Sequence, residues 1–573
     1  MKATLPLAIL LACGSLAAPA QDLSTEITVD RTVVTELPAA SPLSTVSPRI
    51  PALPGSGFTL QPSQYTRASD FSAETAVTDA TPVSGIEAPD TRRGYVWAGY
   101  FPVYNLAAAA GYRFIDSRST QLGASAAFDG MSYNNAYTFG PSRVNSNSLS
   151  LQADFSHNFS KSLTVMAKAL YLHSGLKSPS VADNSLQSQS IDAADISAGI
   201  SGGSAIRYTA GLRFNTFNLG KDILLRPAAD NIAGIVAPGA DDSRIRFGGS
   251  VSVPLSAPAS HIFHVAAEAD ILRARGLVYS DPYSPVAPAH ATTGIVSIDP
   301  SLSFTFRRAQ IRIGARLDIG INSPDRTFHA APDIDIRWSP SGRFTAFASL
   351  GGGEEFRTLS WQYQYSNFAP GSAASTRSYT PVDGRAGIHV RPFGSLGISL
   401  YGGYAAVRRL AMPATVTYFK SPLPYTAFVF VPVDLSGWNC GIDIDYSFRR
   451  LLAVRASAKV FPHNYASGNA AAPDRAKVTF DLTASIRPTK AVTVDLSYHL
   501  RACRRYYAFD MYGVRTAQTM HNISDLDIEA TYAVTDALSI FARLENILNR
   551  HALIQPAVEQ QPIHGLVGAQ LKF

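Results

Sequence analysis

From Gly94 onward, the chain consists of short segments in which apolar and polar residues alternate. In AQIRIGARLDIGI (309–321) every odd-numbered residue is apolar, and the even-numbered residues are polar or glycine. In AKVTFDLTASIR (476–487) the even-numbered residues are the apolar ones, and 244–253 and 492–501 alternate in the same way. Successive side chains of a strand point to opposite faces. Each segment is therefore predicted to be a β-strand with one apolar face and one polar face.

The connections between these segments alternate as well. Tight turns are predicted at 307–309, 339–343, 391–395, 448–450, 487–490 and 534–537, and longer loops at 174–189, 220–242, 274–295, 462–475 and 503–520. Several strand segments reach about 10 to 13 residues, the length of a tilted strand that crosses a membrane. Short turns at one end and long loops at the other are typical of outer-membrane barrels. We predict an all-β fold, a closed antiparallel transmembrane β-barrel of about 22 strands with an irregular N-terminal extension.

The alternation also predicts which face of the barrel is which. Backbone groups at membrane depth have no water to bond to, so the sheet has to close on itself. The apolar face then meets lipid and the charged face lines the lumen. The predicted lumen-lining charges are Arg312, Arg316, Asp318, Asp443, Asp445, Arg455, Lys459, Asp481, Asp495, Asp525, Asp527, Arg543 and Glu545.

Composition agrees with such a barrel. Charged residues make up 16% of the 573 residues, and the mean hydropathy of +0.03 is high for a water-soluble chain. After the N-terminus, however, no run of about 18 apolar residues offers a transmembrane helix. The net charge of +6 is mild, and the basic residues form no stripe or cluster of the kind that nucleic-acid binding requires.

The first residues, MKATLPLAILLACGSLAAPAQD, have the features of a secretory signal peptide. Lys2 precedes a short apolar run, and a small-residue pattern ends at Ala20. We expect residues 1–20 to be the signal peptide, with cleavage between Ala20 and Gln21. An alternative lies in Leu-Leu-Ala-Cys ending at Cys13, which is similar to a lipoprotein box.

Residues 21–92 differ from the rest of the chain. They are rich in Pro, Ser, Thr and Ala, and they lack sustained alternation after Val34. Such composition predicts an extended or loop-like segment. We expect it to form an N-terminal extension, either a small plug or a periplasmic segment, ahead of a barrel that spans 93–573.

Little in the sequence indicates an enzyme or a metal site. His499 and His521 lie near long loops, but no nucleophile motif accompanies them, and the twelve histidines show no metal-binding spacing. No catalytic residue, metal or cofactor is predicted. Cys440 and Cys503 fall about three strands apart, or roughly 14 Å, which is too far for a disulfide without a folded-in loop.

Two aromatic-rich stretches allow alternative interpretations. GYVWAGYFPVY (94–104) and WQYQYSNF (361–368) are suited to an aromatic girdle at the membrane interface. The second stretch, and RACRRYYAFDMYGVR (501–515), would also suit a stacking surface for a ligand in the outer loops.

The C-terminal residues carry a more specific signal. YAVTDALSIFARLENILNR (532–550) ends in Asn546-Ile547-Leu548-Asn549, and PIHGLVGAQLKF (562–573) follows. Both resemble the last two strands of TonB-dependent receptor barrels. The resemblance implies that Gly565, Gly568 and Phe573 belong to the closing strand that the outer-membrane assembly machinery reads as an insertion signal.

The N-terminal part departs from that family. The resemblance implies a plug of about 130 residues or more, whereas only about 70 residues precede the first predicted strand here. TEITVDRTVV (25–34) is similar to the energy-coupling box of such receptors, with Glu26, Ile27, Thr28, Val29, Thr32, Val33 and Val34 as the matching residues. An alternative is one edge strand of the extension, because Val and Thr favour strands.

The sequence therefore predicts a multi-pass barrel in the outer membrane, of the TonB-dependent-receptor type, truncated or without a plug. We expect solute transport or a partner role in an uptake complex. A TonB-type coupling protein or a surface lipoprotein would be its partner, besides lipid and the assembly machinery. The alternatives are a non-conducting structural or assembly barrel and a passive diffusion porin.

Overall fold

The computed structural model describes residues 92–573. The exceptions are 103–104, 136–141, 161, 180–185, 221–222, 226–234, 238–239, 257–259, 282–283, 323–327, 362–375, 419–424, 462–463, 466–475, 510–514 and 556–557. The predicted signal peptide, the junction at Ala20 and Gln21, Cys13, residues 21–91 and the box-like segment 25–34 lie outside the described residues. Among the described residues, no helix is both long and apolar enough to cross a membrane.

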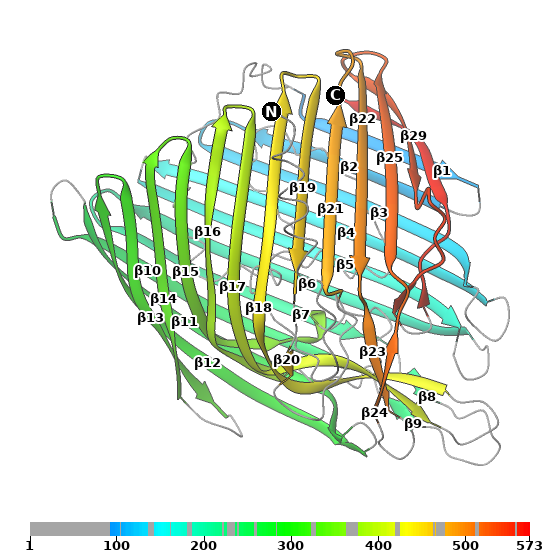
Figure 1. The fold of residues 1–573 in the computed structure, drawn as a ribbon, viewed down its shortest axis with the longest axis horizontal. Coiled ribbons are helices and arrows are strands. Elements are labelled where there is room, and N and C mark those ends of the chain that lie inside the picture. Colours follow the sequence, from blue (N-terminus) through cyan, green and yellow to red (C-terminus); the bar gives the residue numbers. More distant parts are fainter. Residues whose placement is uncertain are drawn as a thin grey trace, which may run out of the picture.

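Twenty-two strands of the described residues form one closed antiparallel ring (Figure 1). In chain order they are β1 (Gly94–Phe101), β2 (Asn105–Asp116), β3 (Thr120–Asn135), β4 (Ser142–Ser160), β5 (Leu163–Pro179), β6 (Leu186–Gly203), β7 (Arg207–Leu219), β10 (Asp241–Pro254), β11 (His261–Asp281), β12 (Ser284–Phe306), β13 (Ala309–Ile321), β14 (Phe328–Ser341), β15 (Phe344–Arg357), β16 (Thr376–Phe393), β17 (Leu396–Tyr418), β18 (Tyr425–Phe448), β19 (Leu452–Val460), β21 (Val478–Ile486), β22 (Val492–Ala502), β25 (Ile523–Ala533), β26 (Leu538–Glu545) and β29 (His564–Lys572). Each pairs with the next, and β29 pairs with β1 to close the ring. The predicted closed barrel of about 22 strands is confirmed.

Seven further short strands lie in the connections. They are β8 (Ile223–Leu225), β9 (Ile235–Ala237), β20 (Asn464–Tyr465), β23 (Arg505–Phe509), β24 (Arg515–Thr519), β27 (Leu553–Gln555) and β28 (Val558–Glu559). β8 pairs with β9, β27 with β28, and β20 with β18. β23 pairs with β24 and also, in parallel, with β17 at Thr415↔Ala508 and Val416↔Phe509. The β17–β18 hairpin therefore reaches along the rim to the β23–β24 hairpin.

The two rims differ as predicted. At one rim, two-residue turns join β12 to β13 (307–308), β14 to β15 (342–343) and β16 to β17 (394–395). The connections at the other rim include the long stretch 220–240 between β7 and β10. Both ends of the ring meet at the short-turn rim, because Gly94 and Phe573 exchange backbone hydrogen bonds of 2.7 and 2.9 Å. This is the expected result of an even strand number.

The prediction of long loops at 174–189 and 274–295 was wrong in part. β5 continues to Pro179 and β6 begins at Leu186, and the two strands are paired up to these residues. β11 and β12 are paired as far as Asp281↔Ser284. Alternation fades at the ends of such hairpins, because the two-residue pattern needs one apolar and one polar surrounding. The backbone hydrogen bonds that define the strands need no such difference.

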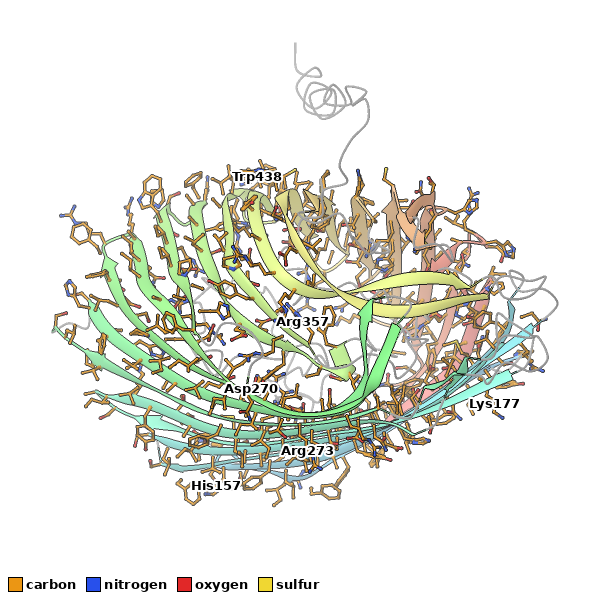
Figure 2. All side chains as sticks on the ribbon, turned by 90° about the horizontal axis from the view of Figure 1, so that it is seen from below. His157, Lys177, Asp270, Arg273, Arg357 and Trp438 are labelled. Atoms are coloured by element: carbon orange, nitrogen blue, oxygen red, sulfur yellow. The ribbon has the colours of Figure 1, made fainter. Side chains whose placement is uncertain are left out.

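The exterior of the ring is apolar, and the interior is polar. On β13, Ile313, Ile319 and Ile321 are 45–52% exposed, whereas Arg316 and Asp318 on the opposite face are 9% and 0% exposed. Figure 2 shows the same division, with Asp270 and Arg357 inside the ring and His157 and Trp438 outside it. The alternation in the sequence therefore corresponds to a lipid-facing exterior and a charged interior.

The seam between the first and last strands is closely packed. Tyr95, Trp97 and Leu566 are buried together, and the ring of Trp97 meets that of Phe541 edge-on at 5.9 Å. Gly568 lies directly against β1, where a methyl group would overlap the Ala98 carbonyl oxygen and approach the Gly99 Cα to 2.7 Å. A glycine is therefore needed at this position for close pairing of the closing strand.

We expect Gly568→Ala to lower the free energy of unfolding by about 1–3 kcal/mol, because the added methyl meets the backbone of Ala98 and Gly99 as well as the ring of Phe541. Gly394→Ala is the matched control, since a methyl at this turn meets nothing within 4 Å. The measurement is the thermal unfolding midpoint of the folded barrel in detergent. Equal midpoints for the two variants would contradict the role of close pairing at the seam.

Candidate functional site

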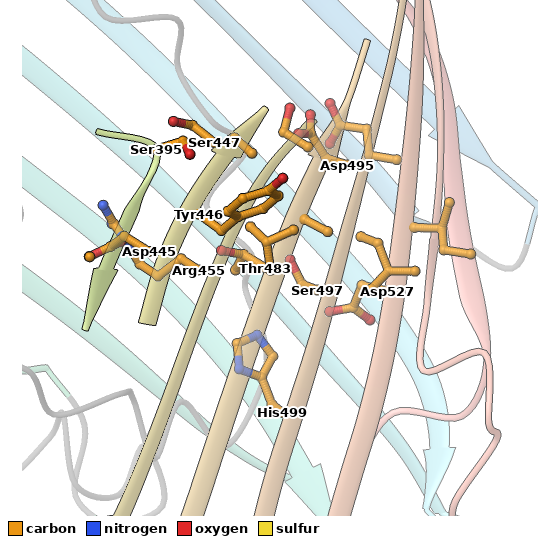
Figure 3. A pocket seen from close by; sticks show the side chains of 18 of the residues that line it. Ser395, Asp445, Tyr446, Ser447, Arg455, Thr483, Asp495, Ser497, His499 and Asp527 are labelled. Atoms are coloured by element: carbon orange, nitrogen blue, oxygen red, sulfur yellow. The ribbon is translucent and has the colours of Figure 1, made fainter. Parts of the chain in front are cut away.

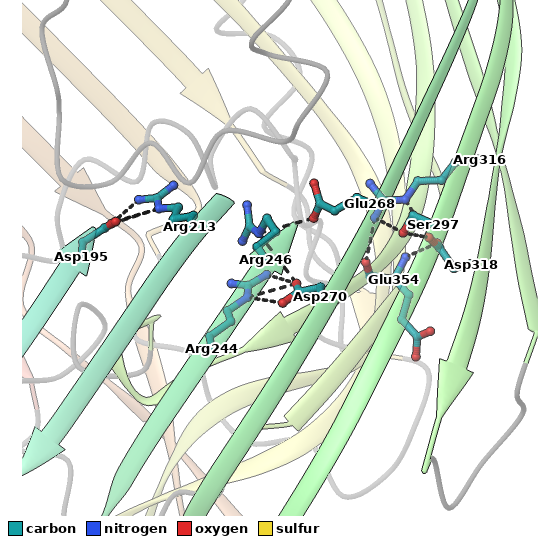
Figure 4. A network of polar contacts seen from close by, with 10 residues as sticks. All are labelled: Asp195, Arg213, Arg244, Arg246, Glu268, Asp270, Ser297, Arg316, Asp318 and Glu354. Carbon is teal, nitrogen blue, oxygen red and sulfur yellow. Dashed lines mark hydrogen bonds and ion pairs between the residues drawn. The ribbon is translucent and has the colours of Figure 1, made fainter. Parts of the chain in front are cut away.

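The interior wall from β6 to β15 is lined by ion pairs, several of which join neighbouring strands (Figure 4). The Arg213 Nε lies 2.9 and 3.1 Å from the two carboxylate oxygens of Asp195. The Arg244 Nε makes the same kind of contact with Asp270, at 2.8 and 3.0 Å. Each pair is bidentate, and such geometry holds a guanidinium group in one orientation.

Asp318 on β13 is the most enclosed charge of this network. Its carboxylate is 0% exposed and accepts hydrogen bonds from Ser297 Oγ (2.6 Å), Arg316 Nε (2.8 Å) and the Glu354 backbone N–H (2.7 Å). Three strands, β12, β13 and β15, are therefore held at one point. A buried carboxylate with this many donors is well satisfied.

The segment after β15 turns into the interior. The Leu359 backbone N–H donates to Asp242 Oδ2 at 2.6 Å, although the two residues are 117 positions apart. Trp361 is 6% exposed, and the Arg357 guanidinium lies 4.9 Å from the centre of its ring. Residues 357–361 therefore cover part of the wall at β10.

A polar hollow of about 480 Å³ lies against the opposite wall, between β16 and β26 (Figure 3). It reaches the short-turn rim, because Gly394 and Ser395 of the β16–β17 turn line it. Its charged lining residues are His389, Arg391, Asp445, Arg455, Asp495, His499, Asp527, Glu529, Arg543 and Glu545. This wall is open, since the side chains of Arg455 and Asp445 are 77% and 54% exposed.

The predicted lumen-lining charges all lie on strands of these two walls, and most have partners on a neighbouring strand. Arg312 lies 3.0 Å from Asp333, Asp443 accepts from Ser457 Oγ at 2.6 Å, and Asp445 pairs with Arg455 at 2.8 Å. Asp481 contacts His499 at 2.7 Å and Arg501 at 2.8 Å, and Arg543 contacts Glu529 at 2.6 Å. Asp495 stands opposite Glu529, and Lys459 stands opposite Gly441 and Thr479. The remaining three predicted charges, Asp525, Asp527 and Glu545, meet near the seam.

That seam cluster is closed by the Asn546–Asn549 element. Asn546 and Asn549 both have a left-handed backbone (φ 48° and 46°), and Asn is one of the few residues that tolerates this conformation. The Asn546 backbone N–H donates to Asp527 Oδ1 at 3.0 Å, and its side chain, 1% exposed, donates to the Gln561 carbonyl oxygen at 2.8 Å. Glu545 lies 2.5 Å from His564 Nε2. The Asn546–Asn549 element therefore anchors the segment between β26 and β29.

Sequence reasoning missed several of the most buried interior charges. Arg244 and Arg246 lie in a segment whose alternation was recognised, and Glu268 and Asp270 alternate with alanines on β11. The same period-two count would have placed them on the interior face. Glu354 and Arg377, which form a 2.8 Å ion pair, lie at the ends of β15 and β16 that border the connection 358–375, where alternation is weak.

The aromatic stretches divide between the faces. Tyr95 and Trp97 pack in the seam, whereas Tyr100 is 56% exposed on the exterior. Trp361 is buried inside, and 362–368 lie outside the described residues. Cys440 and Cys503 are free and exposed. Within the described part of the chain, no three His, Cys, Asp or Glu side chains come together as a metal site would require.

We expect Asp318→Asn to lower the free energy of unfolding by roughly 3–5 kcal/mol, because it leaves the buried Arg316 without its carboxylate. The matched control is Asp445→Asn, whose exposed pair with Arg455 should contribute at most about 1 kcal/mol. Unfolding of the detergent-solubilised barrel, followed by Trp fluorescence against guanidinium concentration, measures both. Similar losses in the two variants would show that burial of the Asp318 network has no special importance.

No protein-family model and no curated protein sequence matches the chain. Among solved structures, the chain is similar to the siderophore receptor PirA from Acinetobacter baumannii, with a TM-score of 0.62 and 10% identity over 85% of this chain and 81% of that one. It is also similar to a mutant of the ferric enterobactin receptor PfeA (TM-score 0.61, 11% identity, 84% and 80% covered), and to the ferripyoverdine receptor (TM-score 0.60, 11% identity, 84% and 72% covered), both from Pseudomonas aeruginosa. At such identities the likeness concerns the fold. The chain has the barrel fold of TonB-dependent siderophore receptors, as the resemblance of residues 532–573 implied.

Proposed function

We propose that the chain is an outer-membrane barrel that takes part in the uptake of a solute. The observation that carries this proposal is the contrast between the two surfaces of the ring. An apolar exterior suits lipid, and a charged interior with a hollow of about 480 Å³ suits a hydrated molecule. The structurally similar proteins are receptors for siderophores, which makes a solute of that class the first candidate.

The hollow is suited to solute contact rather than to chemistry. Its charges are mixed in sign, and several, such as Arg455 and Asp445, are exposed to the interior. On the opposite wall, from β6 to β15, bidentate ion pairs fix the charged side chains, and residues 357–361 cover part of the surface. A solute would therefore move along the wall from β16 to β26. We assign the protein no enzymatic activity and no cofactor.

The N-terminal extension is the next part of the proposal. Residues 21–91 contain nine acidic and three basic residues, whereas residues 92–573 hold 45 of the 49 basic and 34 of the 43 acidic residues. Opposite net charges favour contact between the extension and the barrel, and charged walls concentrate such attraction. We therefore place residues 21–91 at the lumen, where they would regulate passage in place of a full plug.

Assembly and coupling follow from the same proposal. Gly565, Gly568 and Phe573 would form the strand that the assembly machinery recognises, in a protein exported by its signal peptide. Residues 25–34 would bind a TonB-type coupling protein by adding a strand to it, the usual way in which an extended Val- and Thr-rich peptide is recognised. A surface lipoprotein is the alternative partner.

Single-channel conductance of the purified protein in planar bilayers tests the transport role. We expect low conductance for the chain with residues 21–91 and at least severalfold higher conductance after their deletion, because the acidic segment would no longer occupy the lumen. A variant in which Asp70, Glu74 and Asp79 become Asn, Gln and Asn is the control for charge, with an intermediate value. Absence of conductance in all forms would favour a structural barrel, and equal, high conductance would favour a passive porin.

Retention by the periplasmic energy-coupling protein tests the box. Val33→Pro and Val34→Pro should each reduce co-purification strongly, because proline removes a backbone N–H from the added strand. Val46→Pro, outside the box but inside the extension, should leave it unchanged. If the unmodified chain is not retained, residues 25–34 are an ordinary part of the extension.

A further inference from the structure

The short turns on one side of the ring are strongly basic. Between β12 and β22 the ring makes five of these turns, and they hold six arginines, one lysine and no acidic residue. The six arginines, all of them exposed, are Arg307, Arg308, Arg343, Arg449, Arg450 and Arg487. We call this edge of the barrel the arginine rim.

The arginine rim lacks the acidic partners that other exposed arginines have. Arg275 pairs with Asp241 at 2.8 Å near the long-loop rim, and Arg455 pairs with Asp445 at 2.8 Å inside the ring. No acidic side chain of the described residues forms an ion pair with any of the six arginines. None of the six lines the polar hollow either. The arginine rim therefore carries positive charge that neither the fold nor the proposed solute path requires.

Two of the turns repeat the same three residues in the same geometry. Residues 306–308 and 448–450 both read Phe-Arg-Arg, and the first arginine of each has a left-handed backbone, with φ of 48° and 51°. Its guanidinium carbon lies 6.0 Å from the centre of the preceding phenylalanine ring at 306–308, and 5.5 Å at 448–450. Glycine and asparagine adopt this backbone more readily than arginine does. The shape of the turn therefore does not explain the choice of arginine.

The phenylalanine rings show on which side of the rim these guanidinium groups lie. Phe306 is 70% exposed and stands opposite Ala309, on the face of β13 that carries Ile313. Phe448 is 43% exposed and lies on the same face of β18 as Trp438, which is outside the ring (Figure 2). Aromatic rings at the ends of membrane-spanning strands lie at the depth of the lipid headgroups. The guanidinium groups over these rings are therefore on the lipid side, at the level of the lipid phosphates.

We propose that the arginine rim binds anionic phospholipids of the periplasmic leaflet. This inference rests on the proposed place of the barrel in the outer membrane, where short turns face the periplasm. Guanidinium groups donate paired hydrogen bonds to phosphate oxygens, and each basic residue near a membrane surface strengthens the attraction of anionic lipid roughly fivefold. The headgroup would lie against the arginines and the acyl chains against the phenylalanine rings below them.

The lipid contact would be one-sided. The turn 204–206 holds no charged residue, and the turn 534–537 holds an acid, Asp536. Anionic lipid would therefore gather along the rim from β12 to β22 and fix the depth of the barrel in the membrane on that side.

Fluorescence quenching of Trp338 by brominated lipids tests the proposal. Trp338 is 50% exposed and stands opposite Ala309, next to the turn at 306–308. Of the four tryptophans, Trp97 and Trp361 are buried, so Trp438→Phe leaves Trp338 as the lipid-facing reporter. The full chain with this substitution is reconstituted in phosphatidylcholine vesicles that contain either brominated phosphatidylglycerol or brominated phosphatidylcholine. We expect Trp338 to favour phosphatidylglycerol by about threefold or more.

Arg307→Gln combined with Arg343→Gln should remove most of this preference, because both arginines belong to the turns next to Trp338. The matched control is Arg273→Gln combined with Arg408→Gln, which removes the same charge from exposed positions toward the long-loop rim and should keep the preference. Sodium chloride at about 1 M, where the Debye length is about 3 Å, should abolish the preference of the chain that keeps all its arginines. This measurement decides the question if the double variant does not fold.

Equal quenching of Trp338 by the two lipids would overturn the proposal, since the arginines would then be solvated or would bind an acidic protein segment. A preference that survives in Arg307→Gln with Arg343→Gln, or at high salt, would overturn it as well. Neither result alters the conductance by which the proposed function is tested, so the two proposals can fail separately.

Discussion

The structure depends on the pairing of β1 with β29. A sheet in lipid cannot leave a row of unpaired backbone N–H and C=O groups at its edges. The first and last strands must therefore pair with each other, whatever the number of strands. Here the closure rests on reciprocal hydrogen bonds between Gly94 and Phe573 and on the close approach that Gly568 allows. The aromatic rings of Tyr95 and Trp97 pack on the interior side of this seam. The Asn546–Asn549 element lies at the opposite end of the seam, at the long-loop rim.

Closure brings the charged residues of neighbouring strands together in the interior of the ring. The two walls differ in how these charges are paired and how far they are exposed. From β6 to β15 the charges form bidentate pairs and a carboxylate with three donors, and the segment 357–361 covers part of them. From β16 to β26 the pairs are more exposed and border a hollow. The barrel thus combines a wall whose side chains are fixed with one whose side chains are accessible, and only the second is suited to contact with a passing solute.

The sequence predicted the strands and their faces, because period-two alternation arises from surroundings that each strand meets on its own. Asp318 and Arg316 were assigned to the interior by counting alone. Their partners could not be assigned, since Ser297 and Glu354 depend on the register of neighbouring strands. The contact between Asp242 and Leu359 spans 117 positions and follows no local pattern. The same limit explains why no local pattern predicts the inward turn of Trp361 and why the outer part of the β11–β12 hairpin, residues 274–295, is predicted as a loop.

The parallel pairing of β17 with β23 joins two hairpins at the long-loop rim of the ring. β17, β18, β19, β21 and β22 are successive neighbours in the ring, and β23 follows β22 along the chain before it returns to β17. This pairing joins the two hairpins directly, so the β17–β18 and β23–β24 hairpins cannot tilt independently unless Thr415↔Ala508 and Val416↔Phe509 separate. A load applied to one of these hairpins is therefore shared by the other, and the rim above the accessible wall responds as one mechanical unit.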